Sequence, residues 1–402
     1  MTVLIVAGGH YNDRPSGSAK IAFDEAVGLE RRKEDVWVLA QGAPGLPEHE
    51  LSDGIHLLRY LPAQTASWNP ARAFTHQKAA ADLLARHLPH VDAVHGHTPL
   101  ATLAALKLYG NSVHCCYTIH SPARMEMNIV WSNSGSLRRI TAPLGLVLIN
   151  RIEAECLRRS QVITALSQYT IDCIGQIHGR KLAERIQLLP GWVDTARFVP
   201  AEDRKSLKKQ LGWPENIPIL FTLRRLEWRM GIDRLINASH SLLQEGLRFH
   251  LIIGGTGSLR DRLKEQVRTL GLGNSVTFLG KVEDHELSLA YAACDAFVLP
   301  TAELECFGLI ALEALSAGRP VLATRAGAIP ELIQKFDPLW LARSSETKDI
   351  ANLIREFLAD RLPTHPPAEL HEKVYREYNS AKMVGEFIEA TLGRYLNCRA
   401  TN

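Results

Sequence analysis

The stretch Leu299-Pro-Thr-Ala-Glu-Leu-Glu305-Cys-Phe-Gly308-Leu-Ile-Ala-Leu-Glu313-Ala-Leu-Ser-Ala-Gly318-Arg-Pro320 joins three local signals in a fixed order. An apolar strand is predicted to end at Pro300, a loop follows, and a helix is predicted to begin near Phe307. The Gly-Arg-Pro at the end of the stretch is typical of a helix C-terminus. The backbone N–H groups at Gly308 and Leu309 would then point back into the loop, where the helix dipole favours an anion such as a nucleotide diphosphate.

Two glutamates in this stretch have different surroundings. Glu313 lies on a helix that is apolar on nearly every side, so we expect its carboxylate to be buried, which is costly unless donors satisfy it. A ribose with two hydroxyl donors would satisfy it, and so would a buried arginine or a backbone N–H group; the residues alone leave both interpretations open. Glu305 precedes the helix, and on its own it is best interpreted as an exposed loop acid or a first-turn acid favoured by the dipole.

Strand-length apolar runs alternate with longer segments of helical period along most of the chain. The predicted strands are 3–7, 36–39, 56–60, 93–95, 114–119 and 162–165 in the first half, and 219–223, 250–253, 276–279, 296–299 and 321–323 in the second. Continuous apolar strands separated by helices indicate parallel sheets covered on both faces. Because the series occurs twice, the sequence predicts an α/β fold of two doubly wound, Rossmann-like domains with ligands at the carboxyl ends of their strands.

The boundary between the domains is predicted in residues 189–200, where two prolines and a glycine interrupt regular structure. We predict a first domain over 1–190 and a second over 191–379. A C-terminal helix within 380–402 has one apolar side, which is available to pack back on the first domain.

Basic residues and histidines follow several predicted strands. Arg224-Arg225-Leu-Glu-Trp-Arg229-Met230 is a basic loop suited to phosphate oxygens, which guanidinium groups bind bidentately, although a solvated basic loop is a common alternative. His97 and His120 each follow an apolar strand of the first half, where side chains point toward the ligand site of such folds. A lone histidine is more often structural, but two at adjacent strand ends are less easily dismissed.

The segment with seven residues between Glu305 and Glu313 resembles the Glu-x7-Glu signature of retaining glycosyltransferases of family 4, the glycosyl transferases group 1. The resemblance implies the GT-B architecture, in which an acceptor-binding and a nucleotide-sugar-binding Rossmann-like domain face a central cleft. It also implies that Glu305 lies beside the transferred sugar and that Glu313 holds the ribose. Sugar hydroxyls and phosphate would be held by the backbone at Phe307, Gly308 and Leu309.

Residues 224–231 resemble the Gly-Arg-Leu-x-x-x-Lys-Gly element of the same family, which makes Arg225 the expected catalytic, donor-binding arginine. Met230 stands where the family has lysine. This departure puts the second phosphate cation in doubt, and Arg229 or Arg224 is the expected substitute. Methionine packs against a ligand but cannot neutralise phosphate.

Further residues match the family at other strand ends. His120 matches the histidine of a Thr-x-His segment and is expected to contact the transferred sugar, while His97 is a weaker candidate near the acceptor. The remaining donor contacts implied by the resemblance are Gly17 in a shortened glycine loop, Thr256 in a loop near the base, and Val282 at the following strand end.

The expected activity is transfer of a hexose from a UDP- or GDP-linked donor to a saccharide or lipid-linked acceptor, with retention of anomeric configuration, in polysaccharide or glycoconjugate biosynthesis. A nucleotide-sugar epimerase of the same fold and a non-catalytic sugar-nucleotide-binding protein remain alternatives. A Rossmann oxidoreductase needs Gly-x-Gly-x-x-Gly straight after the first strand, which Gly8-Gly9-His10 does not provide. Without Asp-x-Asp or a His/Cys ligand cluster in the sequence, we expect neither metal nor cofactor.

Charge and composition narrow the partners and the compartment. The net charge of +3 over 402 residues gives no reason to expect nucleic acid. Seven scattered cysteines suggest reduced thiols and a cytoplasmic protein, and the short first apolar run predicts a strand, not a signal peptide. Residues 123–160 carry six arginines among apolar residues, so peripheral contact with the inner face of the plasma membrane is an alternative to a core helix with a solvated basic face.

Overall fold

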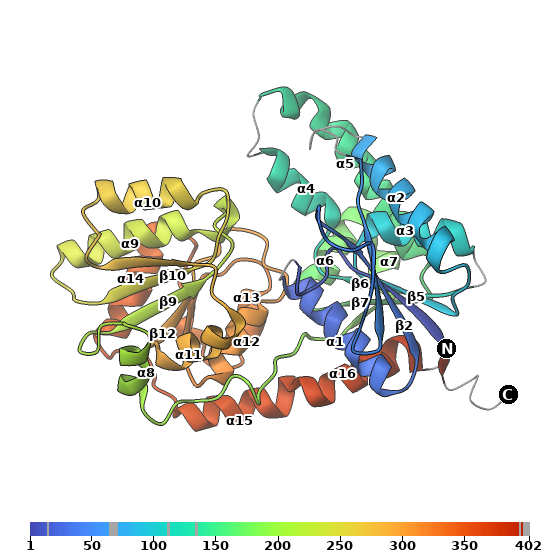
Figure 1. The fold of residues 1–402 in the computed structure, drawn as a ribbon. Helices are drawn as coiled ribbons and strands as arrows, with labels where there is room; N and C mark the ends of the chain where they lie inside the picture. The colour runs from blue at the N-terminus through green and yellow to red at the C-terminus, as the bar shows by residue number, and fades with distance from the viewer. Residues whose placement is uncertain (14–15, 64–70, 111–112, 133–135, 394, 397–402) are drawn as a thin grey trace. The chain divides into compact units, whose positions relative to one another are not determined.

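The computed structural model describes residues 1–13, 16–63, 71–110, 113–132, 136–393 and 395–396. The chain divides into two compact units, Met1–Gly191 with Lys382–Asn402, and Trp192–Ala381. The predicted boundaries at residues 190 and 379 lie close to this division. Figure 1 shows each unit as a twisted sheet between layers of helices.

The first unit contains an eight-stranded sheet in the order β3-β4-β2-β1-β5-β6-β7-β8, in which only β3 is antiparallel to its neighbour. Its strands are β1 (Thr2–Val6), β2 (Asp35–Gln41), β3 (His49–Ser52), β4 (Ile55–Tyr60), β5 (Ala93–Gly96), β6 (His114–Ile119), β7 (Val162–Ala165) and β8 (Ile186–Leu188). Its helices are α1 (Gly17–Arg31), α2 (Ala71–His87), α3 (Pro99–Tyr109), α4 (Ala123–Ser132), α5 (Ser136–Arg159), α6 (Gln168–His178), α7 (Arg180–Ala183) and α16 (Ser380–Ile388), which continues as a π-helical turn (Glu389–Gly393).

Helices cover both faces of this sheet because its central strands are apolar on both sides. On one face α1 and α16 pack on β1, β2 and β5, and this core includes Leu29, Ile388 and Leu392. On the other face lie α2 and α3, with α5 and α6 over β6 and β7. Gly28 lets α16 approach α1 closely, since a Cβ there would lie 2.7 Å from Val384. The C-terminal helix is therefore part of the first unit's core (Figure 1).

The second unit contains a five-stranded parallel sheet in the order β11-β10-β9-β12-β13. Its strands are β9 (Ile219–Leu223), β10 (His250–Gly254), β11 (Val276–Gly280), β12 (Ala296–Leu299) and β13 (Val321–Ala323). Its helices are α8 (Arg204–Gln210), α9 (Ile232–Gln244), α10 (Arg260–Thr269), α11 (Asp284–Ala293), α12 (Leu309–Ser316), α13 (Ile329–Ile333), α14 (Thr347–Leu358) and α15 (Pro367–Tyr378), with 3-10 turns at Trp228–Met230 and Pro338–Trp340.

Two helical layers enclose the second sheet. Helices α9, α10 and α14 form one layer, and α8, α11, α12 and α15 form the other (Figure 1). Tyr291 of α11 packs between Phe221 of β9 and Phe297 of β12, with ring centroids 5.5 and 5.2 Å away. This aromatic core fixes β9 and β12 side by side, so the loops at their carboxyl ends meet.

Each predicted strand is present, which confirms two Rossmann-like sheets; their arrangement around a cleft stays a prediction. Two strands were not predicted: β3, because it is a mostly exposed edge strand without an apolar run, and β8, because it has only three residues. The predicted start of α12 near Phe307 is wrong. Gly308 has φ 94°, a left-handed conformation that a right-handed helix cannot include, so α12 begins at Leu309.

Candidate functional site

The loops after β9 and β12 are joined at the carboxyl edge of the second unit's sheet. The N–H group of Ala302 donates to the carbonyl oxygen of Arg229 at 2.9 Å. A Cβ at Gly231, which has φ 70°, would overlap the carbonyl oxygen of Pro300. Glycine is therefore needed at position 231 both for its backbone conformation and for the close approach of the two loops.

Arg224 links these two loops through its side chain. Its Nη2 lies 2.6 Å from Oε2 of Glu305 and 2.7 Å from the sulfur of Met230. The side chain is only 7% exposed, and its Nε–H is buried without an acceptor among the residues that the structure describes. Since an unsatisfied buried donor is costly, this N–H is a ready partner for a ligand oxygen.

The other two arginines of this loop are placed differently. The side chain of Arg225, the expected catalytic arginine, is exposed, and Arg224 is the residue that pairs with Glu305. Arg229 donates from Nη1 to the carbonyl oxygen of Leu304 at 2.6 Å, so it braces the loop that carries Glu305. Of the two substitutes expected for the lysine absent at Met230, Arg224 is the one in contact with that methionine.

The start of α12 faces the same loop. No side chain caps this helix, and within the described residues the N–H groups of Gly308 and Leu309 donate to no other backbone group. Free N–H groups at a helix start carry a partial positive charge that attracts phosphate or carboxylate. These N–H groups thus lie in the same loop region as the Arg224–Glu305 pair, and anion binding there stays a prediction.

Glu313 lies one turn into α12 and is partly buried, less than the sequence predicted, with Oε2 fully shielded from solvent. Tyr291 of α11 lies beside it: burial raises the pKa of the Tyr291 hydroxyl well above its usual value, and the charge of Glu313 raises it further. A phenol that keeps its proton remains a hydrogen-bond donor next to this carboxylate.

The backbone of Glu305 is held by the loop after β13. The N–H of Ala328 donates to the carbonyl oxygen of Glu305 at 2.7 Å. Gly327, at φ 59°, lies so close that a Cβ would overlap the same oxygen. The position of Glu305 therefore depends on a glycine outside the Glu-x7-Glu segment.

Replacing Gly327 with alanine is expected to destabilise the second unit by about 3 kcal/mol and to displace Glu305, because backbone strain and a backbone clash add. Urea unfolding of the full chain measures this loss. Gly271→Ala is the matched control: its φ is 69° and a Cβ there meets nothing within 4 Å, so it should lose only about 1 kcal/mol. Equal losses for the two variants would contradict this packing.

The loops after β10 and β11 complete this edge of the sheet. The N–H of Leu226 donates to the carbonyl oxygen of Thr256 at 2.8 Å, which ties the arginine loop to the expected base-binding loop. A Cβ at Gly254 would lie 2.9 Å from the side chain of Val282. Thr256 and Val282 thus lie at neighbouring strand ends, and their donor contacts stay predictions. Phe307, in the loop after β12, is buried, and the centroid of its ring lies 6.4 Å from that of Tyr378.

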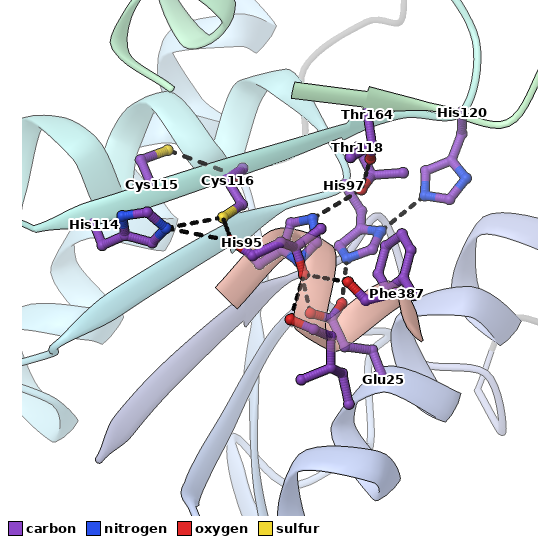
Figure 2. Close-up of polar contacts among 12 residues, drawn as sticks. Glu25, His95, His97, His114, Cys115, Cys116, Thr118, His120, Thr164 and Phe387 are labelled. Carbon is purple, nitrogen blue, oxygen red and sulfur yellow. Dashed lines mark hydrogen bonds and ion pairs between the residues drawn. The ribbon is translucent and has the colours of Figure 1, made fainter. Parts of the chain in front are cut away.

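In the first unit, α1, β5 and β6 bring together a chain of buried polar groups (Figure 2). Glu25 of α1 accepts from Nδ1 of His95 at 2.6 Å through Oε1 and from Nε2 of His97 at 2.9 Å through Oε2. Nδ1 of His97 lies 2.8 Å from Nε2 of His120. Figure 2 shows His97 between Glu25 and His120, so the two predicted histidines contact each other, and His97 also contacts a carboxylate that was not predicted from the sequence.

Both ring nitrogens of His97 have protein partners, and its side chain is 1% exposed. These partners occupy His97 within the protein, and its acceptor contact stays a prediction; His120 is partly exposed. Gly17 opens α1 after the capping residue Ser16, whose hydroxyl accepts from the N–H of Ala19 at 3.2 Å. The neighbouring residues 14–15 of this loop lie outside the described residues.

The charge state of Glu25 follows from its partners. Complete burial alone would raise its pKa, but attraction and hydrogen bonds from His95 and His97 lower the pKa to about 2. Burial lowers the pKa of His97, and it lowers that of His120 well below its usual value, with the nearby histidines adding to the effect. Near neutral pH the cluster thus holds a carboxylate with neutral His97 and His120.

Because the pKa of Glu25 falls on folding from 4.5 to about 2, its stabilising contribution is present above pH 4.5 and is lost as the pH falls toward 2. The full loss is roughly 3 kcal/mol. Between pH 5 and 3, the free energy of unfolding should depend on pH less steeply in Glu25→Gln than in the wild type. The difference in slope should correspond to about one fewer proton taken up on unfolding. Equal slopes in the two proteins would contradict an ionised Glu25 in the folded state.

Comparison with protein families covers both units. A glycosyltransferase family 4 model matches residues 15–197, and a glycosyl transferases group 1 model matches residues 203–377. The two matches follow one another along the chain and together span most of it. The chain belongs to glycosyltransferase family 4.

Curated relatives match about half of the chain. It is 30% identical over 207 residues to a GDP-mannose-dependent monoacylated alpha-(1-6)-phosphatidylinositol monomannoside mannosyltransferase of Corynebacterium glutamicum, which covers 50% of this chain and 53% of the relative. It is 29% identical over 225 residues to a mannosylfructose-phosphate synthase of Agrobacterium fabrum, which covers 53% of this chain and 49% of the relative. The chain thus spans about half the length of these curated relatives.

Solved structures share the fold of this chain. Sucrose-phosphate synthase from Thermosynechococcus elongatus aligns with a TM-score of 0.80 and 20% identity, covering 99% of this chain and all of that one. Anabaena HepE, in complex with UDP and glucose, aligns with a TM-score of 0.71 and 20% identity over 97% of this chain and 98% of that one. At such identities these matches establish the GT-B fold and leave substrates open.

Two further properties bear on partners. Among the described residues, no helix combines the length and apolar character needed to cross a bilayer. Glu25, His95 and His97 offer ligand atoms that lie within 4.8 Å of one another, which is close enough for the three residues to share a cation. Each of these atoms is already hydrogen-bonded within the group.

Proposed function

We propose that this glycosyltransferase moves a hexose from a UDP- or GDP-linked donor to a saccharide or lipid-linked acceptor, with retention of anomeric configuration. The observation that carries the proposal is the Arg224–Glu305 pair, which lies beside the uncapped start of α12 at the carboxyl edge of the second sheet. A GDP-mannose-dependent relative and a UDP- and glucose-bound protein of the same fold support these two donor classes.

The leaving group explains why a cation is needed there. When the sugar departs, negative charge develops on the β-phosphate, and fixed donors aimed at that charge lower the barrier most. Arg224 supplies a guanidinium whose Nε–H has no acceptor in the described part of the chain, and the start of α12 supplies backbone N–H groups. We propose that these groups make transfer independent of a metal ion.

The two glutamates take different roles in this proposal. Glu305, held by Arg224 and by the loop at Ala328, accepts hydrogen bonds from the hydroxyls of the transferred sugar. Glu313, one turn further along α12, accepts from the ribose hydroxyls. The leaving phosphate takes the proton of the acceptor, so the reaction needs no covalent bond to Glu305.

The test is product analysis with UDP- and GDP-linked hexoses in the presence of EDTA, with saccharide and lipid-linked acceptors. We expect release of the nucleoside diphosphate together with a glycoside of the same anomeric configuration as the donor, resolved by NMR. An epimerised sugar without a glycoside would establish an epimerase instead. Binding without turnover under all these conditions would leave only the non-catalytic sugar-nucleotide-binding alternative.

We also propose that α4 and α5 contact a membrane that carries the lipid-linked acceptor. The two helices lie side by side (Figure 1). Gly145 of α5 packs against the ring of Trp131 of α4. Leu144 and Val147 are 67% and 49% exposed on α5. Exposed Arg124 and Arg151 add positive charge, and the side chains of residues 138–139 lie outside the described residues. Apolar and basic groups on one hairpin favour an anionic bilayer surface.

Combining Leu144→Asp with Val147→Asp should lower the fraction of protein that sediments with anionic vesicles by about tenfold, because two apolar contacts are replaced by like charge. Leu51→Asp is the matched control: Leu51 is 62% exposed on β3 of the same unit and should keep wild-type sedimentation. Wild-type protein that stays in the supernatant would remove the membrane proposal and leave the transfer reaction untouched.

A further inference from the structure

The cluster at Glu25 is not explained by the donor site in the second unit. Glu25 lies on the buried side of α1 with no exposure, and both of its carboxylate oxygens face histidines. A buried carboxylate costs several kcal/mol unless donors satisfy it, so a chain that needed only packing would place an apolar residue here. The cluster ends at His120, the partly exposed histidine expected beside the transferred sugar.

The direction of each hydrogen bond follows from the carboxylate. An ionised Glu25 can only accept, so Nδ1 of His95 and Nε2 of His97 must both carry protons. Neutral His97 then has a lone pair on Nδ1, and the 2.8 Å contact requires Nε2 of His120 to donate to it. Neutral His120 therefore has its lone pair on Nδ1, for which no protein donor occurs among the described residues.

A second set of hydrogen bonds, on the other side of His95, fixes the geometry of the cluster at Glu25. Nε2 of His95 lies 2.8 Å from the Thr118 hydroxyl, which lies 2.7 Å from the Thr164 hydroxyl. The ring of Phe387 from α16 stacks on His95 with centroids 5.5 Å apart. Strands β5, β6 and β7 and helices α1 and α16 thus all hold the cluster, and Figure 2 shows these contacts converging on Glu25 and His95.

We propose that Glu25 and His97 are positioning residues that hold His120 as its Nε2–H tautomer, so that its Nδ1 accepts a hydrogen bond from a hydroxyl of the bound sugar. The inference rests on the proposed function for the identity of that hydroxyl. The tautomer of His120 is a property of the protein without substrate and can be tested by itself. A tautomer fixed in advance avoids reorganisation when the sugar binds, which is the role that a buried carboxylate plays toward an imidazole in hydrolytic triads.

The resting protein gives the most direct test. Long-range 1H–15N correlation spectra of the full-length chain, labelled with 15N histidine and assigned with His120→Gln, report which nitrogen carries the proton. We expect His97 and His120 both as Nε2–H tautomers at pH 7.5. An Nδ1–H tautomer or an imidazolium at His120 would overturn the inference. One equivalent of zinc retained through gel filtration would also overturn it, because a protonated Nε2 of His97 cannot ligate a metal.

Two variants of similar volume test the functional half. In His97→Gln the side-chain amide can donate to Glu25 and accept from His120. The methionine side chain in His97→Met cannot donate to Glu25 and offers His120 only a weak sulfur acceptor. We expect His97→Met to lower kcat/KM by about 10- to 100-fold and His97→Gln to recover most of that loss. If His97→Met fails to fold, Glu25→Gln combined with His97→Met removes the uncompensated buried charge and takes its place.

The outcomes separate this inference from the proposed function. A wild-type protein that transfers no sugar contradicts the function, while its spectra still decide the tautomer. Equal loss of kcat/KM in His97→Gln and His97→Met, with His120 as Nε2–H in both, would overturn the role of the tautomer in sugar binding. We expect His97→Met to lose kcat/KM and to show an Nδ1–H signal at His120. We expect His97→Gln to recover both the kcat/KM and the Nε2–H signal of His120.

Discussion

Arg224→Ala is expected to lower kcat by about 10²- to 10³-fold, because it removes a preorganised cation from the charge that develops on the leaving diphosphate. The change also leaves Glu305 without the guanidinium that lies 2.6 Å from its carboxylate. Initial rates at saturating donor measure the loss. Arg234→Ala is the matched control in the same unit, since Arg234 pairs with Ser345 and Glu346, and its rate should match that of the wild type.

A rescue experiment makes this prediction sharper. The sulfur of Met230 lies 2.7 Å from Arg224, so a lysine at position 230 would bring its ammonium group to the same region. Met230→Lys in the Arg224→Ala background should restore kcat by at least about tenfold. The same change in the wild type should reduce activity, because two buried cations would repel each other. Arg224→Ala with a normal rate would show that Arg225 or Arg229 is the phosphate cation instead.

Glu313→Ala is expected to weaken donor binding by about 10- to 100-fold, because hydrogen bonds to a charged group contribute about 1.5–3 kcal/mol each. Isothermal titration of the full-length protein with the nucleotide sugar measures the dissociation constant. Tyr291 would lose its charged neighbour, but α12 should persist because its buried side chains are mostly apolar and the Ser316 hydroxyl still donates to the carbonyl oxygen of Phe198.

Glu303→Ala is the matched control for this measurement, since Glu303 is an exposed glutamate of the loop before α12. It should bind the donor as the wild type does. The free nucleoside diphosphate should show the same difference between Glu313→Ala and wild type as the nucleotide sugar, because the ribose is common to both. A Glu313→Ala variant that binds both normally would remove the ribose contact from the account.

The strands could be predicted because buried parallel strands are continuous apolar runs, and the sheet order then brought the Arg224 and Glu305 loops together. The choice between Arg224 and Arg225 could not be predicted from the sequence. Successive side chains at a strand end point in opposite directions, and a motif aligned by sequence does not show which guanidinium turns inward. The structure turns Arg224 toward Glu305 and leaves Arg225 exposed.

Glu25 shows a second limit of sequence interpretation. Its signal was available, since a carboxylate on the apolar side of α1 poses the same burial problem that selected Glu313. Its partners could not be predicted, because His95 and His97 are far from it in sequence and reach it only through packing of α1 on β5. His97 could be predicted as a candidate from its position at a strand end, but the partners of its two ring nitrogens depend on tertiary contacts.

We propose that the second unit binds a nucleotide sugar at the Arg224–Glu305 edge without a metal ion. Thermal unfolding in EDTA, with UDP- and GDP-linked hexoses each in large excess, tests it most directly. A donor at 100 times its dissociation constant adds about 2.7 kcal/mol, which raises the Tm of a unit of this size by roughly 5 °C or more. We predict such a rise with at least one donor, and a smaller rise at the same concentration in Arg224→Ala and Glu313→Ala. No rise with any donor in the wild type, or an equal rise in all three proteins, would contradict the account.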